Sequence, residues 1–221
     1  MESNNQWIET MPFWEKLSET QQNMLIKASI VESFNKGRIL NRTDEECKGM
    51  IILKSGQIRV YMLSDEGREV TLYRLHKGDI GVLSASCLLD SITFDVVIEV
   101  VEGGETILVP SGILHQVIEQ NPYMELFLQR QANERFSDVM WTMQQLLFMR
   151  MDRRVAIFLW DEISTTKQNI LAYTHDEVAR FIGSAREVVT RVLKYFVQEG
   201  VLKLSRGKIE IIDKDKLKSY L

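Results

Sequence analysis

The last third of the chain contains two short helical patterns separated by one glycine. The first pattern begins at Thr174, and Glu177 follows three residues later, which is the spacing of a capping box at a helix start. Gly183 then ends this helix, because glycine readily adopts the left-handed conformation that terminates helices. Ser184 and Glu187 repeat the capping-box spacing and predict the start of a second helix. Two short helices joined by so tight a turn form a helix-turn-helix, whose second helix enters the major groove of DNA.

Both predicted helices have one apolar face, which indicates that each packs on a core. The inner positions are Val178, Phe181 and Ile182 in the first helix, and Val188, Val189, Val192, Leu193 and Phe196 in the second. The other face of the second helix carries the charged residues Arg186, Glu187, Arg191 and Lys194. Val201–Leu204 and Lys208–Ile212 follow as a predicted hairpin around Ser205-Arg206-Gly207, so the pattern is that of a winged helix-turn-helix.

The charge of the chain is unevenly distributed. The net charge is −4, but residues 150–221 contain 14 Lys and Arg against 10 Asp and Glu, a balance of +4. The remaining residues hold 13 against 21, a balance of −8. A basic excess that coincides with the helix-turn-helix fits binding to the phosphates of double-stranded DNA.

The first half of the chain is rich in short strand patterns. Apolar or alternating runs are separated by glycine-containing turns, at residues 50–53, 58–63, 70–75, 95–101 and 106–109. Short strands at this spacing predict an antiparallel roll or barrel. Together with the helical segments they give the fold class α+β.

A long helical segment follows Asn121-Pro122 and continues to about Met149 without an internal proline or glycine. A helix of roughly 28 residues spans ~40 Å, and its apolar positions recur at about 3.5-residue spacing, which is typical of a helix that pairs with a second copy. The alternative is that these positions pack only on the strands of the same chain. The predicted dimer seam consists of Ala132, Phe136, Val139, Met140, Met143, Leu146 and Leu147.

Another helix is predicted at Met151–Glu162, followed by a polar connector at Ser164–Asn169. We therefore expect a β-roll with N-terminal helices at residues 1–120, a dimerisation helix at 121–149 and a winged helix-turn-helix at 150–221.

These residues resemble the cyclic-AMP receptor protein/FNR family of bacterial transcription regulators, and the resemblance covers almost the whole chain. The matching motifs are Lys54-Ser55-Gly56-Gln57-Ile58, Asp65-Glu66-Gly67-Arg68-Glu69, Lys77-Gly78-Asp79-Ile80-Gly81, Asn121-Pro122 and the run from Gly183 to Arg191. The resemblance implies a cyclic-nucleotide-binding-like β-roll, a homodimer, and RNA polymerase as a partner.

The resemblance also implies that Arg186, Glu187 and Arg191 read the bases of a TGTGA-type half-site within an inverted repeat. Arginine can pair with O6 and N7 of guanine, and a carboxylate can accept from N4 of cytosine. The alternatives are that Glu187 only caps its helix and that the arginines contact only phosphates. The residues expected to support these contacts or to bind the DNA backbone are Thr174, Ser184, Thr190, Lys194, Arg206 and Lys208.

The predicted effector pocket departs from that of the cyclic-AMP receptor. Val82 stands where the receptor has a glutamate for the ribose, and residues 91–95 contain no cation for the cyclic phosphate. We therefore expect an apolar or weakly polar small-molecule effector, as yet unidentified, rather than cyclic AMP. The expected pocket residues are Gly78, Ile80, Gly81, Val82, Cys87, Thr93, Val139 and Met140.

An iron–sulfur cluster and a haem would each need particular protein ligands. An iron–sulfur cluster needs about four thiolates, whereas the chain has only Cys47 and Cys87. Haem is left open, with His76 as an axial ligand and Met140 and Met143 lining an apolar pocket. The plainer interpretation makes His76 an ordinary turn histidine, and the same holds for His115 and His175. Cys87 is either a redox-sensing thiol or a small apolar side chain.

Two competing functions follow from the same residues. A metal-dependent enzyme on a β-roll would need several histidine and carboxylate ligands, and the roll offers only His76 and His115, so we expect no enzyme. A regulator with a vestigial sensor that binds DNA without an effector is the second alternative.

The N-terminus has no signal pattern, and no run approaches the ~20 apolar residues of a membrane span. We expect a cytoplasmic protein.

Overall fold

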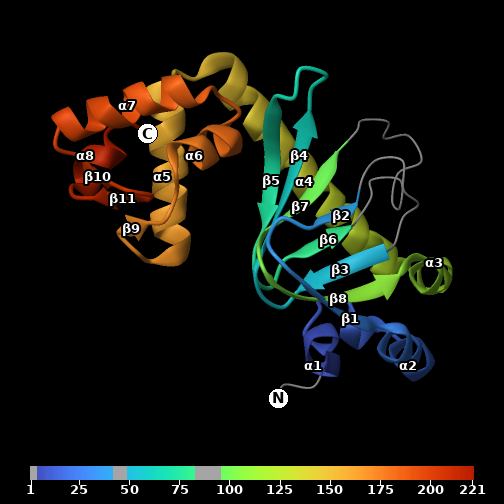
Figure 1. Ribbon diagram of the computed structural model, residues 1–221. Helices are drawn as coiled ribbons and strands as arrows, with labels where there is room; N and C mark the ends of the chain where they lie inside the picture. The colour runs from blue at the N-terminus through green and yellow to red at the C-terminus, as the bar shows by residue number, and fades with distance from the viewer. Residues whose placement is uncertain (1–3, 42–48, 83–95) are drawn as a thin grey trace. The chain divides into compact units, whose positions relative to one another are not determined.

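The computed structural model of the protein describes residues 4–41, 49–82 and 96–221 (Figure 1). The chain forms two compact units, each with its own buried apolar clusters. The first unit comprises Met1–Leu63 and Leu72–Val139, and the second comprises Ser64–Thr71 and Met140–Leu221. The segment Ser64–Thr71, which contains a turn and the first residues of the following strand, therefore groups with the C-terminal part of the chain.

The first unit contains two four-stranded sheets whose described pairings are antiparallel. One sheet has the order β1 (Ile30–Phe34), β8 (Gly104–Pro110), β3 (Gly49–Leu53), β6 (Ile80–Val82). The other has the order β2 (Ile39–Asn41), β7 (Val97–Glu102), β4 (Gln57–Leu63), β5 (Glu69–Leu75). One buried cluster takes side chains from both sheets, including Ile51 and Leu108 from the first and Val60 and Ile98 from the second. The predicted antiparallel roll is thus confirmed.

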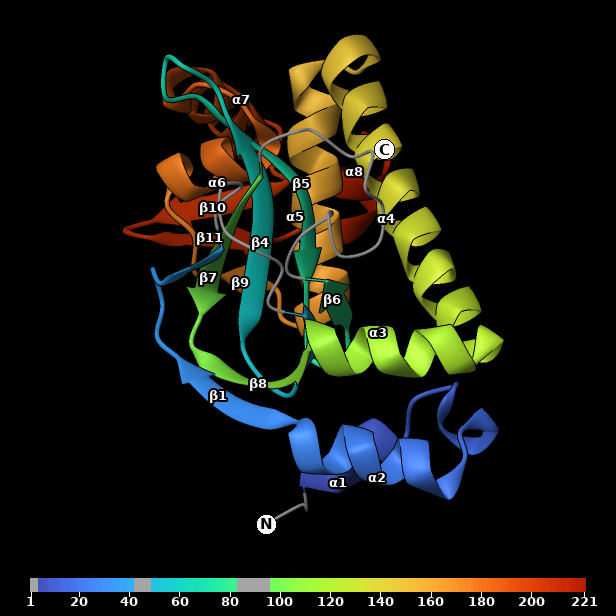
Figure 2. The same cartoon turned by 90° about the vertical axis from the view of Figure 1, so that its right-hand side faces the viewer.

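Helices cover one end of this roll. They are α1 (Asn4–Glu9), the short 3-10 helix η1 (Trp14–Lys16), α2 (Glu19–Ala28) and α3 (Ser111–Gln120). In Figures 1 and 2, α1 and α2 lie below β1 and β8. Helix α2 begins with a complete capping box, which is formed by Ser18 and Gln21. Helix α3 was not predicted; its N-cap is Pro110, which makes no side-chain cap.

The long helix is present as α4 (Pro122–Phe148), 27 residues without interruption (Figure 2). At 1.5 Å per residue its length is about 40 Å. Its start is fixed by Asn121, whose side-chain oxygen accepts hydrogen bonds from the amides of Tyr123 (3.0 Å) and Met124 (3.3 Å). Both predicted ends agree with the structure to within one or two residues. Across the described residues, neither α4 nor any other helix is long and apolar enough to cross a membrane.

The second unit is a winged helix-turn-helix, as the sequence predicts. Its elements are α5 (Met151–Thr166), β9 (Ile170–Leu171), α6 (His175–Ile182), α7 (Arg186–Gln198), β10 (Leu202–Ser205), β11 (Lys208–Ile211) and α8 (Lys214–Lys218). Figure 1 shows α6 and α7 beside α5, with the wing strands close to α8. The core of this unit is built on Val155, Leu159, Val189, Leu193 and Phe196, all fully buried.

Three details of this unit differ from the sequence prediction. Helix α5 continues four residues past Glu162, so part of the predicted polar connector is helical. The wing has three strands rather than two, because β9 pairs with β11 through Leu171 and Ile209. Helix α8 was also not predicted. The two residues of β9 are too few to produce a recognisable alternation of apolar and polar positions.

Candidate nucleic-acid interface

The first helix of the helix-turn-helix begins with the predicted capping box. The Thr174 hydroxyl accepts a hydrogen bond from the Glu177 amide (3.1 Å), and the Glu177 carboxylate accepts from the Thr174 amide (2.9 Å). The helix ends at Gly183, whose φ of 63° is left-handed, as predicted. The amide of Ser184 then bonds to the carbonyl of Ala179 (2.9 Å), which completes a Schellman-type ending.

The second helix begins differently from the prediction. Helix α7 starts at Arg186, its N-cap is Ala185, and no side chain caps it. The predicted capping box of Ser184 and Glu187 is therefore wrong. The physical reason is that Ser184 belongs to the ending of α6, so the N-cap of the second helix is Ala185, one residue later than its sequence pattern suggests. In this geometry Glu187 makes no cap hydrogen bond at the start of α7.

Two arginines stabilise the turn between the helices. The guanidinium of Arg154 on α5 donates to the carbonyl of Ile182, and Arg68 donates to the carbonyl of Gly183 (2.7 Å). Positive charge at a helix C-terminus complements the helix dipole and the unpaired carbonyls there. Burial, and secondarily the charge of Arg68, lower the pKa of Arg154. Both guanidinium groups therefore bond to the backbone of the turn.

The outer face of α7 is open to solvent. Arg186, Glu187, Arg191 and Lys194 are exposed, while Val189, Leu193 and Phe196 on the opposite face are buried. Within the described part of the chain, the side chains of Arg186, Glu187 and Arg191 make no hydrogen bond to protein groups. The fold thus brings these predicted site residues together on one face, with their donors and acceptors free for a ligand.

The remaining predicted contact residues lie around this face. Thr190 is on α7 itself and is half-buried, and its hydroxyl lies 3.0 Å from Nδ1 of His175. Arg206 and Lys208 are exposed at the β10–β11 turn of the wing. Thr174 is exposed but its hydroxyl is engaged in the capping box, so it serves the fold in the first place.

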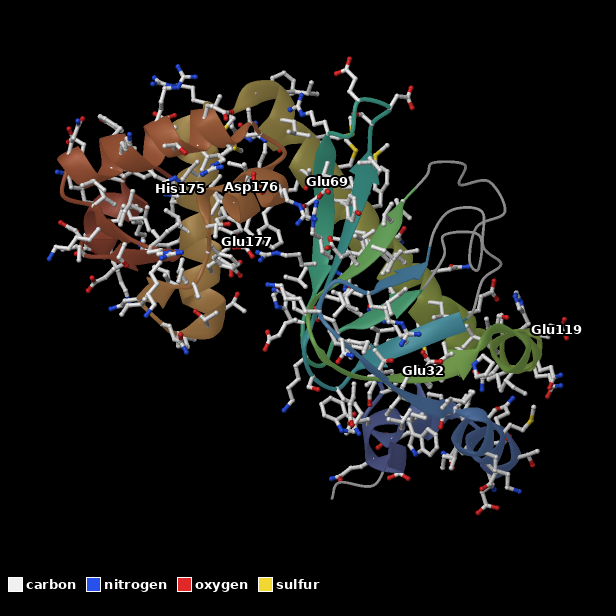
Figure 3. The ribbon with its side chains drawn as sticks, in the orientation of Figure 1. Glu32, Glu69, Glu119, His175, Asp176 and Glu177 are labelled. Atoms are coloured by element: carbon white, nitrogen blue, oxygen red, sulfur yellow. The ribbon has the colours of Figure 1, made fainter. Side chains whose placement is uncertain are left out.

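Charged residues of α6 have partners inside the second unit. Figure 3 labels His175, Asp176 and Glu177 at the start of this helix, and also Glu69. Glu69 forms a salt bridge with Arg180 (2.9 Å), so Arg180 is engaged away from the outer face of α7. Burial, followed by the charges of Arg186 and Lys194, lowers the pKa of His175.

The predicted effector residues are only partly described. Gly78 and the strand residues Ile80 and Gly81 lie at the end of the β5–β6 turn and in β6. A Cβ at Gly81 would lie 2.6 Å from the Leu75 Cδ1 atom, so a side chain there would require Leu75 to shift. The backbone of Val82 completes β6.

The other predicted effector residues differ in their surroundings. Cys87 and Thr93 lie outside the described residues, as does Cys47. Val139 on α4 is half-buried, and Met140 is 45% exposed. The structure therefore leaves the effector pocket a prediction.

His76, the predicted haem ligand, has partners in the roll. Its Nδ1 atom lies 3.2 Å from the Gln57 side-chain amide nitrogen, and its backbone amide donates to Asp79 (2.8 Å). Because an amide NH₂ group only donates, Nδ1 acts as the acceptor, and iron could be bound only through the other ring nitrogen. Over the described ranges, no group of three or more His, Cys, Asp or Glu side chains is arranged to bind a metal ion.

One residue that the sequence analysis overlooked lies on α4 beside the predicted pocket residue Val139. Arg135 is one helical turn before Val139, its guanidinium carbon lies 5.3 Å from the centre of the Tyr73 ring, and it bonds to Asp138 (2.9 Å). Burial raises the pKa of Tyr73, while Arg135 acts in the opposite direction. The signal was available, since a cation four residues before Val139 shares its helix face.

The predicted dimer seam is mostly exposed in the single chain. Phe136 is 65% and Leu147 is 66% exposed, and Met140 and Met143 are each 45% exposed. Ala132, Val139 and Leu146 are half-buried. The alternative in which the seam packs only on its own strands does not account for four large apolar side chains in solvent.

Comparison with known proteins agrees with this architecture. Residues 31–121 match the cyclic nucleotide-binding domain, and residues 153–220 match the Crp-like helix-turn-helix domain. A crystal structure of a transcriptional regulator of the Crp/Fnr family from Eubacterium rectale is 40% identical, with a TM-score of 0.89 over 95% of this chain and 97% of that one.

Two more distant proteins extend the comparison. The transcriptional activator Anr of Pseudomonas aeruginosa is 25% identical over 186 residues, which cover 80% of this chain and 75% of Anr. The global regulator Clp of Xanthomonas campestris is 18% identical with a TM-score of 0.76 over 89% of this chain and 100% of that one, a likeness of fold alone. The chain belongs to the Crp/Fnr family of DNA-binding transcription regulators.

Proposed function

We propose that the protein acts as a homodimer on an inverted repeat with TGTGA-like half-sites, and that an effector in the β-roll other than cyclic AMP controls its DNA binding. The observation that supports this most directly is the outer face of α7. Three charged side chains near the start of that helix are exposed and make no hydrogen bond to described protein groups, while the opposite face is fixed in the core.

The chemistry of this face suits the major groove. Arg186 and Arg191 can each pair with O6 and N7 of a guanine, and Glu187 can accept from N4 of a cytosine. The absence of a capping role for Glu187 supports base reading, because its carboxylate is not engaged in the helix start. Base edges are read in this way by the first residues of recognition helices in helix-turn-helix proteins.

Phosphate contacts would surround the base-reading residues. Lys194 lies two turns after Glu187 on the same face, and Arg206 and Lys208 project from the wing. Such contacts fix the register of a protein on DNA without carrying sequence information.

The exposed apolar face of α4 supports the homodimer. Phe136, Met140, Met143 and Leu147 recur at spacings of four, three and four residues, which is the pattern of a helix that packs against a copy of itself. A large exposed apolar patch on a soluble chain usually marks a protein interface. Two copies of α7 could then meet half-sites about one helical turn apart.

The effector is proposed to bind in the roll beside α4. Clp is c-di-GMP responsive, which indicates that this fold does not imply cyclic AMP. Here Val82 replaces the ribose-binding glutamate, and Arg135 with Tyr73 adds a cation and a phenol near Val139. The alternatives are a haem held through His76 and a regulator that needs no effector. An absorption and mass spectrum of the purified protein would distinguish them, because haem or a retained ligand would be visible.

The base-reading role is tested by Arg186→Ala. We expect specific binding to a TGTGA inverted repeat to weaken by about 1–3 kcal/mol, while binding to random DNA changes little. Gel-shift titrations on both duplexes measure this. Arg130→Ala, which removes an exposed arginine of α4, is the matched control and should leave both affinities unchanged. Equal losses on both duplexes would show that Arg186 contacts only phosphate.

The dimer is tested by Met140→Arg. A charge within the apolar seam should shift the protein towards monomer in sedimentation experiments, because it would be buried without a partner. Glu134→Arg introduces the same side chain at an exposed position of α4 outside the seam and should leave the dimer intact. A Met140→Arg protein that sediments as the wild type would exclude this seam.

A further inference from the structure

His175 and Thr190 connect the two helices of the helix-turn-helix. Nδ1 of His175, the first residue of α6, lies 3.0 Å from the Thr190 hydroxyl on α7. Thr190 is one turn after Arg186 and one turn before Lys194, and both cations act electrostatically on the imidazole. The pair therefore lies between two positive charges on the face that we propose binds DNA.

The acidic residues near the imidazole are either exposed or bonded to other protein groups. On its own helix the next two residues are acidic, but Glu177 is engaged in the capping box and Asp176 is exposed. On α5, Glu162 accepts the hydroxyl of Tyr173 (2.6 Å). Among the described residues, no protein group bonds to Nε2 of His175, and the side chain is half-buried, so this nitrogen can meet a ligand.

We propose that His175 and Thr190 form a proton-controlled contact to the DNA backbone, in which protonation of the imidazole lets both side chains donate to phosphate oxygens. This proposal rests on the DNA-binding role of the outer face of α7 but not on any half-site sequence. The first helix of a helix-turn-helix crosses the DNA backbone, so His175 is placed for phosphate rather than for bases.

The reason lies in the count of hydrogen-bond donors. A neutral imidazole carries one N–H. If that proton is on Nε2, Nδ1 must accept from Thr190, and the hydroxyl hydrogen is then consumed inside the protein. If it is on Nδ1, Thr190 can donate outwards, but Nε2 presents a lone pair to the DNA. Only the imidazolium donates from both nitrogens, and only then do His175 and Thr190 both donate to phosphate, which is solely an acceptor.

The direction of the pH effect follows from the same groups. In the free protein, burial and the two neighbouring cations hold the pKa of His175 below its ordinary 6.5. A phosphate beside the ring favours the charged form and raises the pKa. DNA binding therefore takes up a proton, and affinity rises as the pH falls through the interval between the free and bound pKa values. Below the free-state value the gain is complete.

The experiment measures the affinity of the full chain for a random-sequence duplex at about pH 5.5 and about pH 7.5, at one salt concentration. We expect tighter binding at the lower pH, by about ten-fold for each unit that the phosphate raises the pKa. Calorimetry in two buffers of different ionisation enthalpy should show proton uptake on binding. His175→Gln, which cannot titrate, should flatten the pH profile and abolish the uptake.

His115→Gln removes an exposed histidine of the first unit and is the matched control, which should retain both the profile and the uptake. Thr190→Val keeps the shape of the side chain without its hydroxyl, and it should weaken binding at low pH. A wild-type profile parallel to that of His175→Gln, or Thr190→Val affinity equal to wild type at low pH, would overturn the proposal. The duplex has a random sequence, so this pH dependence can be measured even if the protein shows no preference for TGTGA half-sites.

Discussion

The two helices of the helix-turn-helix start in opposite ways. Helix α6 begins with a complete capping box, in which Thr174 and Glu177 satisfy each other's amides. Helix α7 begins at Arg186, four residues after the end of α6, and its N-cap Ala185 provides no side-chain cap. Capping residues stabilise a helix by roughly 0.5–2 kcal/mol, so the difference is energetically significant.

The two helix starts have different roles within the second unit. The start of α6 is committed to the fold, because its polar side chains are used on its own backbone. The start of α7 leaves Arg186 and Glu187 unengaged, and its orientation depends instead on the buried residues Val189, Leu193 and Phe196. A helix that must present its first turn to a ligand is thus fixed by its inner face rather than by its end.

The strongest test of this comparison is Phe196→Ala. Phe196 is fully buried in the core of the second unit, and loss of a buried phenylalanine side chain costs about 3–5 kcal/mol. We expect the free energy of unfolding of this unit to fall by that amount, as measured in denaturant. A loss below about 1 kcal/mol would mean that α7 is held by something other than its inner face.

A smaller effect is expected at the helix starts themselves. Thr174→Ala should lower the free energy of unfolding by about 1 kcal/mol, because it removes the cap of α6. Ser184→Ala should change it by less than about 0.5 kcal/mol, since Ser184 contributes its backbone rather than a side-chain cap. Equal losses in the two variants would contradict the asymmetry between the helices. Thermal or denaturant unfolding of both proteins decides the matter.

The smallest effect is expected from adding a cap to α7. Ala185→Ser supplies a hydroxyl at the N-cap and should raise the free energy of unfolding by about 0.5–1 kcal/mol. Ala185→Val, which has no hydroxyl, is the control and should give no gain. If Ala185→Ser is not stabilising, the amides at the start of α7 are satisfied in some other way.

Much of this architecture could be predicted from the sequence. The strand alternation, the uninterrupted helix after Asn121 and the Thr174 capping box are local patterns, and each is found where the pattern indicates. The start of α7 could not be predicted, because Ser184 and Glu187 have the spacing of a cap. The capping box is excluded only by the folded turn, in which the Ser184 amide bonds to the end of α6.

The candidate site shows the same limit. Exposure of Arg186, Glu187 and Arg191 follows from the apolar periodicity of α7. The pairing of His175 with Thr190 does not, because fifteen residues separate them and their contact depends on the angle between two helices. Likewise, Arg135 on α4 meets Tyr73 on β5 although the two residues lie far apart in the sequence.

The uncapped start of α7 has a consequence for evolution. Because no side chain makes a cap hydrogen bond at its start, substitutions at positions 186 and 187 should cost little stability. Gene duplicates of such a regulator could therefore acquire new target sequences by single mutations that leave the fold intact. A capped recognition helix would couple every change of target to a loss of stability, and fewer such changes would survive selection.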